Sequence, residues 1–243
     1  MSITEPNSKP TVVLVHGAFA ESSSWNGVIS GLVGDGYPVI AVANPLRGVT
    51  SDADYLRALL ADIVGDIIVV GHSYGGTVMS GGATGNPNVK ALVFVGAFAP
   101  EEGETPGDLA GKFPGSTLAA TLTAVPLPEG GNDLYIRQGE YRAQFAADSP
   151  AEVAGVMAVT QRPIREAAFS EASGPAAWKS VPSWFLFGAA DHNIPAEVHR
   201  FMAERAGSRK TIELAGGSHT VGIPEAAQVV DLIREAAAAT TGR

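Results

Sequence analysis

Short apolar runs alternate with amphipathic stretches along most of the chain. Each run is continuously apolar, as expected for strands that are buried on both faces of a parallel sheet. The runs are residues 11–15, 38–42, 67–70, 89–98, 183–187 and 210–214, and the last is more polar, which favours a position near a sheet edge. Strands that alternate with helices indicate parallel βαβ units. The pattern therefore predicts an α/β fold with a mostly parallel, doubly wound sheet of about six strands.

Helices are predicted between these strands from apolar residues at helical spacing. Ser51 begins one of them and has Asp54 three residues later, a pair that resembles a capping box. Pro224 is a suitable first residue for the closing helix. The predicted helices are residues 22–33, 51–64, about 76–80 and 224–233.

About eighty residues separate the fourth and fifth predicted strands, far more than a crossover needs. Residues 101–131 are rich in Pro, Gly and Thr and are predicted to be irregular, whereas residues 133–147 and 151–160 are predicted to be helical. We interpret residues 101–180 as a largely helical cap inserted into a core of residues 1–100 and 181–243. The alternative is a set of surface helices packed beside the sheet.

Composition narrows the possible partners. The 243 residues are 45% hydrophobic, enough for one substantial core, and their net charge of −9 argues against nucleic acid or an anionic membrane as partner. There is no cysteine, and therefore no disulfide, thiol nucleophile or thiolate metal site. The first ten residues lack the apolar region of a secretory signal, and no apolar run is long enough for a membrane span. We expect a cytoplasmic monomer or homodimer.

The clearest chemical motif is Gly-His-Ser-Tyr-Gly at residues 71–75, directly after a β-branched run. It fits the G-x-S-x-G nucleophile elbow, a strand-to-helix turn that presents a serine hydroxyl above the sheet. The backbone at such a serine is strained, so Gly71 and Gly75 are needed where strand and helix approach closely. The following helix would direct unpaired N–H groups at the place where negative charge develops. The motif predicts Ser73 as a nucleophile.

A serine nucleophile needs a base, and His219 lies where a base is expected. It follows the last predicted strand and precedes the final helix, so it should lie at the same sheet edge as Ser73. The alternative is a histidine on a surface loop. We interpret the other four histidines as structural (His16 and His72), exposed (His192) or on an ordinary helix face (His199).

The base in turn needs a carboxylate that holds its tautomer and stabilises the imidazolium. Asp191 follows the fifth predicted strand and is the favoured candidate. The rivals are Glu101 and Glu102, which follow the fourth strand but begin a loose, polar loop.

Two backbone N–H groups are also needed for an oxyanion. Tyr74, after the nucleophile, should supply one, and Ala18, in the loop after the first strand, the other. The candidate walls of a substrate pocket are Phe19, Phe98, Met157 and Trp178, for which core packing is the alternative. No His, Asp or Glu cluster has metal-ligand spacing and no phosphate-binding loop is present, so no cofactor is expected.

These motifs carry a family resemblance over nearly the whole chain. Residues 16–18 (His-Gly-Ala), residues 71–75, Asp191 and His219 resemble the α/β-hydrolase fold family, in the compact group of plant methylesterases, hydroxynitrile lyases and bacterial carboxylesterases. The resemblance implies the chain order serine, aspartate, histidine that these residues show. The full hydrolase sheet usually has eight strands, and here the first two are expected to be missing.

Two departures from the family limit the chemistry. The lyases of this group carry a threonine in the His-Gly position and a lysine just after the base, where this chain has Gly17 and Thr220. A cyanohydrin lyase is therefore disfavoured. Dehalogenases and epoxide hydrolases of the same fold use an aspartate where this chain has Ser73.

The sequence thus predicts a serine hydrolase that cleaves a small carboxylic ester or lactone through an acyl-enzyme on Ser73. The expected partner is a small ester-like molecule, with neither nucleic acid nor membrane involved. Three alternatives remain open: acyl transfer or perhydrolysis, carbon–carbon hydrolysis, and a non-catalytic small-molecule receptor on the same scaffold.

Overall fold

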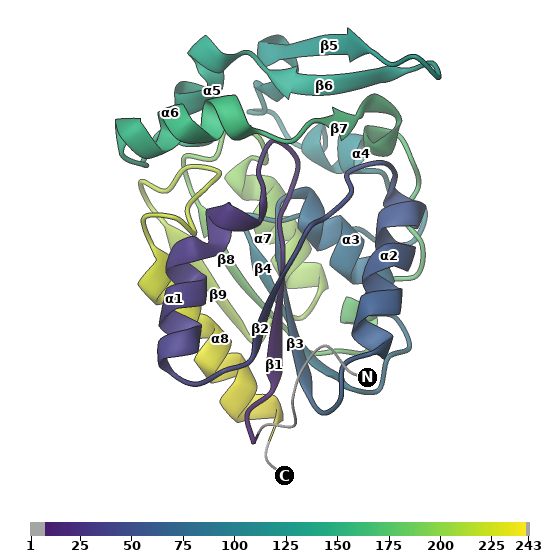
Figure 1. Cartoon of the computed structure of the whole chain (residues 1–243), viewed down its shortest axis with the longest axis vertical. Coiled ribbons are helices and arrows are strands. Elements are labelled where there is room, and N and C mark those ends of the chain that lie inside the picture. Colours follow the sequence, from purple (N-terminus) through teal and green to yellow (C-terminus); the bar gives the residue numbers. More distant parts are fainter. Residues whose placement is uncertain (1–7, 242–243) are drawn as a thin grey trace.

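A six-stranded parallel sheet runs through the centre of the molecule in the computed structural model, which describes residues 8–241 (Figure 1). Its order is β2 (Val39–Val42), β1 (Thr11–Val15), β3 (Ile67–His72), β4 (Val89–Val95), β8 (Ser183–Gly188) and β9 (Lys210–Leu214). The predicted α/β fold and the edge position of the last strand are confirmed. Residues 1–7, which were inspected above for a signal segment, and residues 242–243 lie outside the described part.

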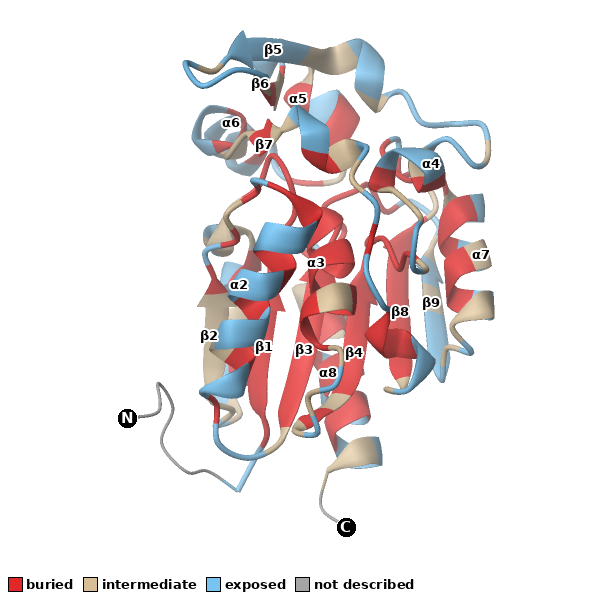
Figure 2. Cartoon of the chain, turned by 90° about the vertical axis from the view of Figure 1, so that its right-hand side faces the viewer, coloured by how far each residue is buried: buried red, intermediate tan, exposed pale blue. Residues whose placement is uncertain are grey.

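Both faces of this sheet are covered by helices, as the continuous apolar runs predicted. Successive side chains of a strand point to opposite faces. Val12 and Leu14 therefore pack with α1 (Asn26–Gly34) and α8 (Ala226–Thr240). Val13 and Val15 belong to the core on the other face, formed with α2 (Val49–Ala61), α3 (Tyr74–Gly82) and α7 (Ala196–Arg205). The central strands are buried along their length, while β9 is largely exposed (Figure 2).

The start of α2 differs from the predicted capping box. The helix begins at Val49, and its cap residue Gly48 has no side chain to accept a hydrogen bond. The Glu171 carboxylate accepts instead from the N–H groups of Val49 and Thr50 at 2.8 and 2.9 Å. The cap of this helix therefore comes from more than a hundred residues away in the chain.

The segment between β4 and β8 lies above the carboxyl ends of the strands (Figure 1). We call residues 101–180 the cap segment, and we propose that it is a cap domain inserted into the core. It contains α4 (Pro106–Ala110), α5 (Gln138–Phe145), α6 (Ala151–Thr160), four-residue 3₁₀ turns at 118–121 and 166–169 and a shorter one at 177–179.

An antiparallel sheet of β5 (Leu122–Pro126), β6 (Asn132–Ile136) and β7 (Ile164–Arg165) completes the cap segment. Two predictions were therefore wrong: residues 133–136 form a strand rather than the start of a helix, and residues 101–131 are not irregular throughout. Gly130 and Gly131, both at positive φ, build the turn that joins β5 to β6. Because its strands are short and its outer strand is exposed, the alternation of apolar and polar residues is too brief to predict these strands from the sequence.

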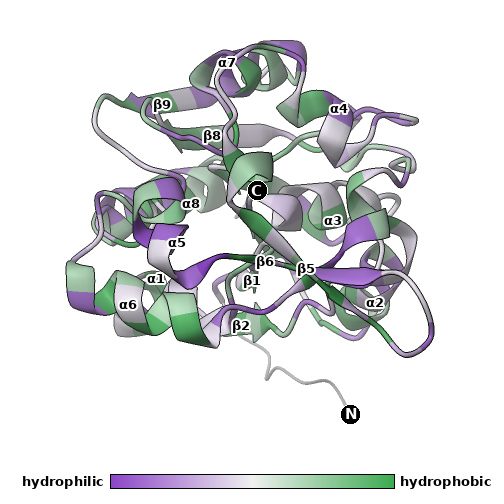
Figure 3. Cartoon of the chain, turned by 90° about the horizontal axis from the view of Figure 1, so that it is seen from above, coloured by the Kyte–Doolittle hydropathy of each residue, from purple (hydrophilic) through white to green (hydrophobic). Residues whose placement is uncertain are grey.

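Helix α6 leaves an apolar face uncovered. Val153, Val156 and Val159 are 38, 57 and 65% exposed, and the helix carries hydrophobic residues along its length at the rim of the molecule (Figure 3). In the described part of the chain no helix has the length and apolar character needed to cross a bilayer. Val153 and Val156 instead line the groove described below.

Candidate active site

The predicted elbow is present between β3 and α3. Ser73 has φ +53° and ψ −125°, a strained conformation for a residue with a side chain. A Cβ on Gly75 would lie 2.3 Å from the Val15 carbonyl oxygen, and one on Gly71 would lie 2.9 Å from the Gly75 backbone. Glycine is therefore required on both sides of the serine, because the helix passes directly against the ends of β1 and β3.

His219 and Asp191 are hydrogen-bonded to each other, with 2.7 Å between Nδ1 and Oδ2. The other carboxylate oxygen, Oδ1, accepts from the N–H groups of Asn193 and Ile194 at 2.7 and 2.9 Å. Burial by itself raises the pKa of Asp191, but the charge of His219 and the hydrogen bonds outweigh burial and hold that pKa below its usual range. The rival carboxylate of Glu101 is paired with Lys179 instead.

The loop that carries His219 is fixed from three sides. His72, the residue before Ser73, donates from Nε2 to the His219 carbonyl oxygen at 3.0 Å. The Ser218 N–H and hydroxyl donate to the Asp148 carboxylate, and the Thr220 N–H donates to the Phe145 carbonyl oxygen, both in the cap segment. His219 is thus held at the elbow by the core and by the cap segment together.

In the described residues Ser73 and His219 are connected through His72 rather than by a direct hydrogen bond. His72 contacts His219 and directly precedes Ser73, yet within the described residues the Ser73 hydroxyl makes no hydrogen bond to the imidazole. Such contacts are often loose in unliganded sites and tighten when substrate binds.

The His-Gly loop before Ala18 is held by a neutral histidine. His16 Nε2 accepts from the Asn44 N–H at 3.1 Å, so its proton is on Nδ1 and is donated to the Gly17 carbonyl oxygen at 2.9 Å. Burial lowers the pKa of His16 to about 4. The structural role expected for His16 agrees with these contacts.

Ala18 and Tyr74 line one small cavity together with Ser73. The cavity has a volume of about 20 Å³ and is also bordered by Phe19 and Phe98. Tyr74 is the first residue of α3, so its N–H has no partner inside the helix. The two predicted oxyanion donors and two of the predicted pocket residues therefore meet at the serine.

Asp52 is a site residue that sequence reasoning missed. It is fully buried in the first turn of α2, accepts the Tyr74 phenol hydrogen at 3.0 Å and also accepts the Arg47 N–H. Burial raises the pKa of Asp52 despite these donors. The contact ties Tyr74, the residue after Ser73, to a neighbouring helix, and a lone acid within a helix gives no sequence signal for such a partner.

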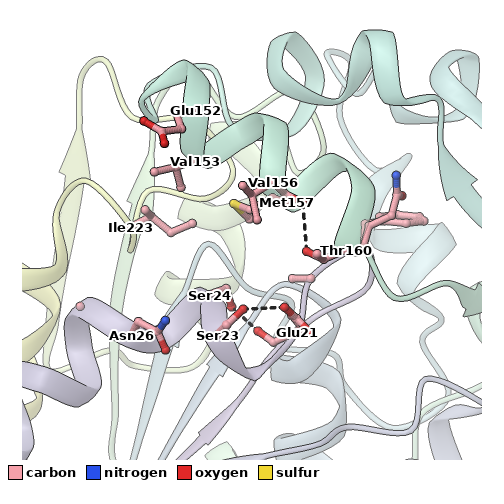
Figure 4. A pocket seen from close by; sticks show the side chains of 14 residues that line it. Glu21, Ser23, Ser24, Asn26, Glu152, Val153, Val156, Met157, Thr160 and Ile223 are labelled. Carbon is pink, nitrogen blue, oxygen red and sulfur yellow. Dashed lines mark hydrogen bonds between the residues drawn. The ribbon is translucent and has the colours of Figure 1, made fainter.

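A groove of about 600 Å³ opens on the other side of Phe19. Val153, Val156 and Met157 of α6 line its upper side, while Ser23 and Ser24 of the 3₁₀ turn at Ser22–Trp25 and Asn26, the first residue of α1, line its lower side (Figure 4). Phe19 is therefore the partition between the groove and the Ser73 cavity, because it lines both.

Phe19 is held in place by the cap segment. It has φ +60°, its N–H donates to the Arg162 carbonyl oxygen at 3.0 Å, and its own carbonyl oxygen accepts from the Tyr141 hydroxyl at 2.6 Å. By contrast, Trp178, predicted as a pocket wall, lines neither cavity in the described structure. Its indole N–H donates to the Pro100 carbonyl oxygen at 2.8 Å, and its ring lies against Arg205, so packing accounts for it.

Of the two remaining histidines, one lies where it was predicted and the other does not. His192 is exposed, as predicted. His199 is not on an ordinary helix face: it is buried, and its Nε2 lies 3.2 Å from Asp191 Oδ2. Within residues 8–241, no three His, Asp or Glu side chains are placed to hold a metal ion.

Comparison with known proteins agrees with this fold. The chain is 26% identical to methylesterase 8 of Arabidopsis thaliana, over 89% of this chain and 85% of that one. It is 31% identical to a carbendazim-hydrolysing esterase of a Nocardioides strain over 45% of this chain, a match that spans only 54% of that relative. The crystal structure of polyneuridine aldehyde esterase superposes with a TM-score of 0.80 at 19% identity, covering 93% of this chain and 98% of that one. Residues 12–232 match the model of the alpha/beta hydrolase family, and the chain belongs to that family.

Proposed function

We propose that this protein is a serine hydrolase that cleaves a small carboxylic ester or lactone through an acyl-enzyme on Ser73. One observation carries the proposal: a buried carboxylate holds the imidazole of His219 beside a strained serine elbow. The esterases among its relatives support the same class of reaction.

In the first half-reaction the Ser73 hydroxyl attacks the ester carbonyl carbon while His219 Nε2 takes the hydroxyl proton. The negative charge moves to the carbonyl oxygen, where the N–H groups of Ala18 and Tyr74 stabilise it. Collapse of this intermediate breaks the bond to the alkoxy oxygen, and His219 returns the proton to the leaving alcohol. A water molecule, deprotonated by His219 Nε2, then attacks the acyl carbon; the bond between that carbon and Ser73 Oγ breaks, the acid leaves, and His219 returns the proton to Ser73 Oγ.

The sizes of the two cavities suggest which part of a substrate each of them holds. The Ser73 cavity has room for little more than one water molecule, so only a small group fits there without movement of Phe19. The groove is much larger and its α6 wall is apolar. We infer that an apolar chain of the substrate lies in the groove while its carbonyl group sits at Ser73.

Filling the groove tests this division. Met157→Trp is expected to lower kcat/KM for p-nitrophenyl octanoate about tenfold, since the longer chain loses its apolar contact area, and to leave p-nitrophenyl acetate turnover nearly unchanged. The control is Val159→Trp, which adds the same side chain to an exposed position of α6 outside the groove. An equal change for both esters, or an equal effect of the control, would remove the groove from the substrate path.

Covalent labelling tests the nucleophile itself. Incubation with a fluorophosphonate is expected to add one phosphonyl group, found by intact mass and mapped to Ser73 by peptide mass spectrometry. Ser73→Ala should remain unlabelled, whereas Ser80→Ala, which removes a buried serine of the following helix α3, should be labelled normally. A folded wild-type protein that binds esters without labelling or turnover would instead be a receptor.

A further inference from the structure

Asp191 receives a second histidine besides His219. His199 of α7 directs Nε2 to the same carboxylate oxygen, Oδ2, at 3.2 Å, while His219 Nδ1 lies 2.7 Å from it. With the two backbone donors on Oδ1, the carboxylate has four N–H donors, which uses all of its acceptor positions. Its orientation is thereby fully determined.

The protonation of His199 follows from its contacts. An ionised carboxylate can only accept, so Nε2 must carry a proton. Nδ1 is buried and has no hydrogen-bond partner among the described residues, and the ring stacks on Phe187 with 4.7 Å between centroids. A second proton on Nδ1 would be buried and unsatisfied, so the ring is neutral, and burial lowers the pKa of His199 accordingly.

We propose that His199 is a positioning residue that anchors Asp191 and limits how much of its negative charge is available to His219. The inference rests on the proposed serine hydrolase function. Removing the Nε2 donor leaves Oδ2 with His219 alone, which stabilises the imidazolium and makes the base harder to deprotonate. The same removal loosens the carboxylate, because one of its anchors is lost.

The groups around His199 bear on any pH dependence. Asp191 and His219 face it from the loops after β8 and β9, and Glu213 of β9 acts on it from farther away while paired with Arg200. No substitution below touches Glu213 or Arg200. A shift in the pH profile can therefore be assigned to the contact between His199 and Asp191.

Two variants separate positioning from packing. His199→Met keeps a side chain of similar length but has no donor, and we expect kcat to fall about tenfold with little change in KM, since a misplaced base slows only the chemical step. The acid limb of kcat/KM should move to higher pH by about half a unit. His199→Gln retains an N–H donor that can reach Asp191, and it is expected to restore most of kcat and the wild-type acid limb.

Labelling separates this inference from the proposed function. Wild-type protein that fails to react with the fluorophosphonate would contradict the serine hydrolase itself. If the wild type reacts, and His199→Met and His199→Gln then show the same kcat and the same acid limb, His199 has a packing role only and the inference is overturned. Urea unfolding of both variants shows whether a loss of kcat merely follows a loss of folded protein.

Discussion

Replacement of Ser73 by alanine is expected to lower kcat/KM for p-nitrophenyl acetate by about 10⁴-fold or more. The reason is chemical rather than structural: the variant lacks the oxygen that forms the acyl-enzyme, and the lost hydroxyl makes no hydrogen bond to the base in the described structure. The fold should survive, since alanine meets the same backbone strain that serine already bears at φ +53°. Steady-state rates together with a thermal unfolding curve check both statements.

Ser80→Ala is the matched control for that experiment. Ser80 lies on α3, the helix that follows Ser73, is also buried and donates its hydroxyl hydrogen to the Gly76 carbonyl oxygen at 2.8 Å. Its removal is expected to leave ester turnover within about twofold of wild type, because Ser80 does not border the Ser73 cavity. Ester turnover by Ser73→Ala within tenfold of wild type would contradict nucleophilic catalysis by this serine.

The free energy of unfolding is expected to fall steeply as the pH drops from 7.5 to 5. His16 and His72 are buried and neutral, and burial lowers their pKa values to about 4 and about 3. The unfolded chain takes up protons on both from about pH 6.5, whereas the folded protein does so only below pH 4. The unfolded state therefore binds more protons in this interval, and stability that is complete above pH 6.5 is lost as pH falls.

The size of this loss follows from the width of the interval. At pH 5 each of the two histidines has lowered the free energy of unfolding by roughly 2 kcal/mol, since one pH unit corresponds to about 1.4 kcal/mol for a single proton. Urea unfolding at pH 7.5, 6.0 and 5.0 measures this loss of unfolding free energy. All three pH values lie above the range in which ordinary carboxyl groups titrate. His16→Gln should flatten the pH slope by about one proton, while His192→Gln, at an exposed position, should leave it unchanged. A constant unfolding free energy from pH 7.5 to 5 would contradict this account.

The order of the catalytic candidates along the chain was enough to predict where they would meet. Ser73, Asp191 and His219 each follow a strand of a parallel sheet, and the carboxyl ends of parallel strands lie at one edge. The glycines beside Ser73 belong to the same local chemistry, because a sharp strand-to-helix turn leaves no space for a Cβ. Local pattern and short-range sterics therefore predicted the sheet, the elbow and the pairing of His219 with Asp191 rather than with Glu101.

Contacts between distant segments had no such signal. Glu171 caps α2, Asp52 binds the Tyr74 hydroxyl, and Asp148 holds Ser218, each across a long stretch of chain. A buried polar group must find a partner, but the sequence does not say which one, because the pairing has no period and depends on how whole elements are placed. The second histidine on Asp191 was missed for this reason: His199 is eight residues away on a helix, and only the packing of α7 against β8 turns it inward.

The sequence by itself determined the family, the parallel α/β sheet and the candidate site residues, since these depend on hydrophobic periodicity and on motifs a few residues long. The tertiary structure alone decided the sheet within the cap segment, the groove beneath α6, and the network that holds Asp191 and His219. These features arise where elements from different parts of the chain pack together, so their geometry exists only once the fold has brought those elements into contact.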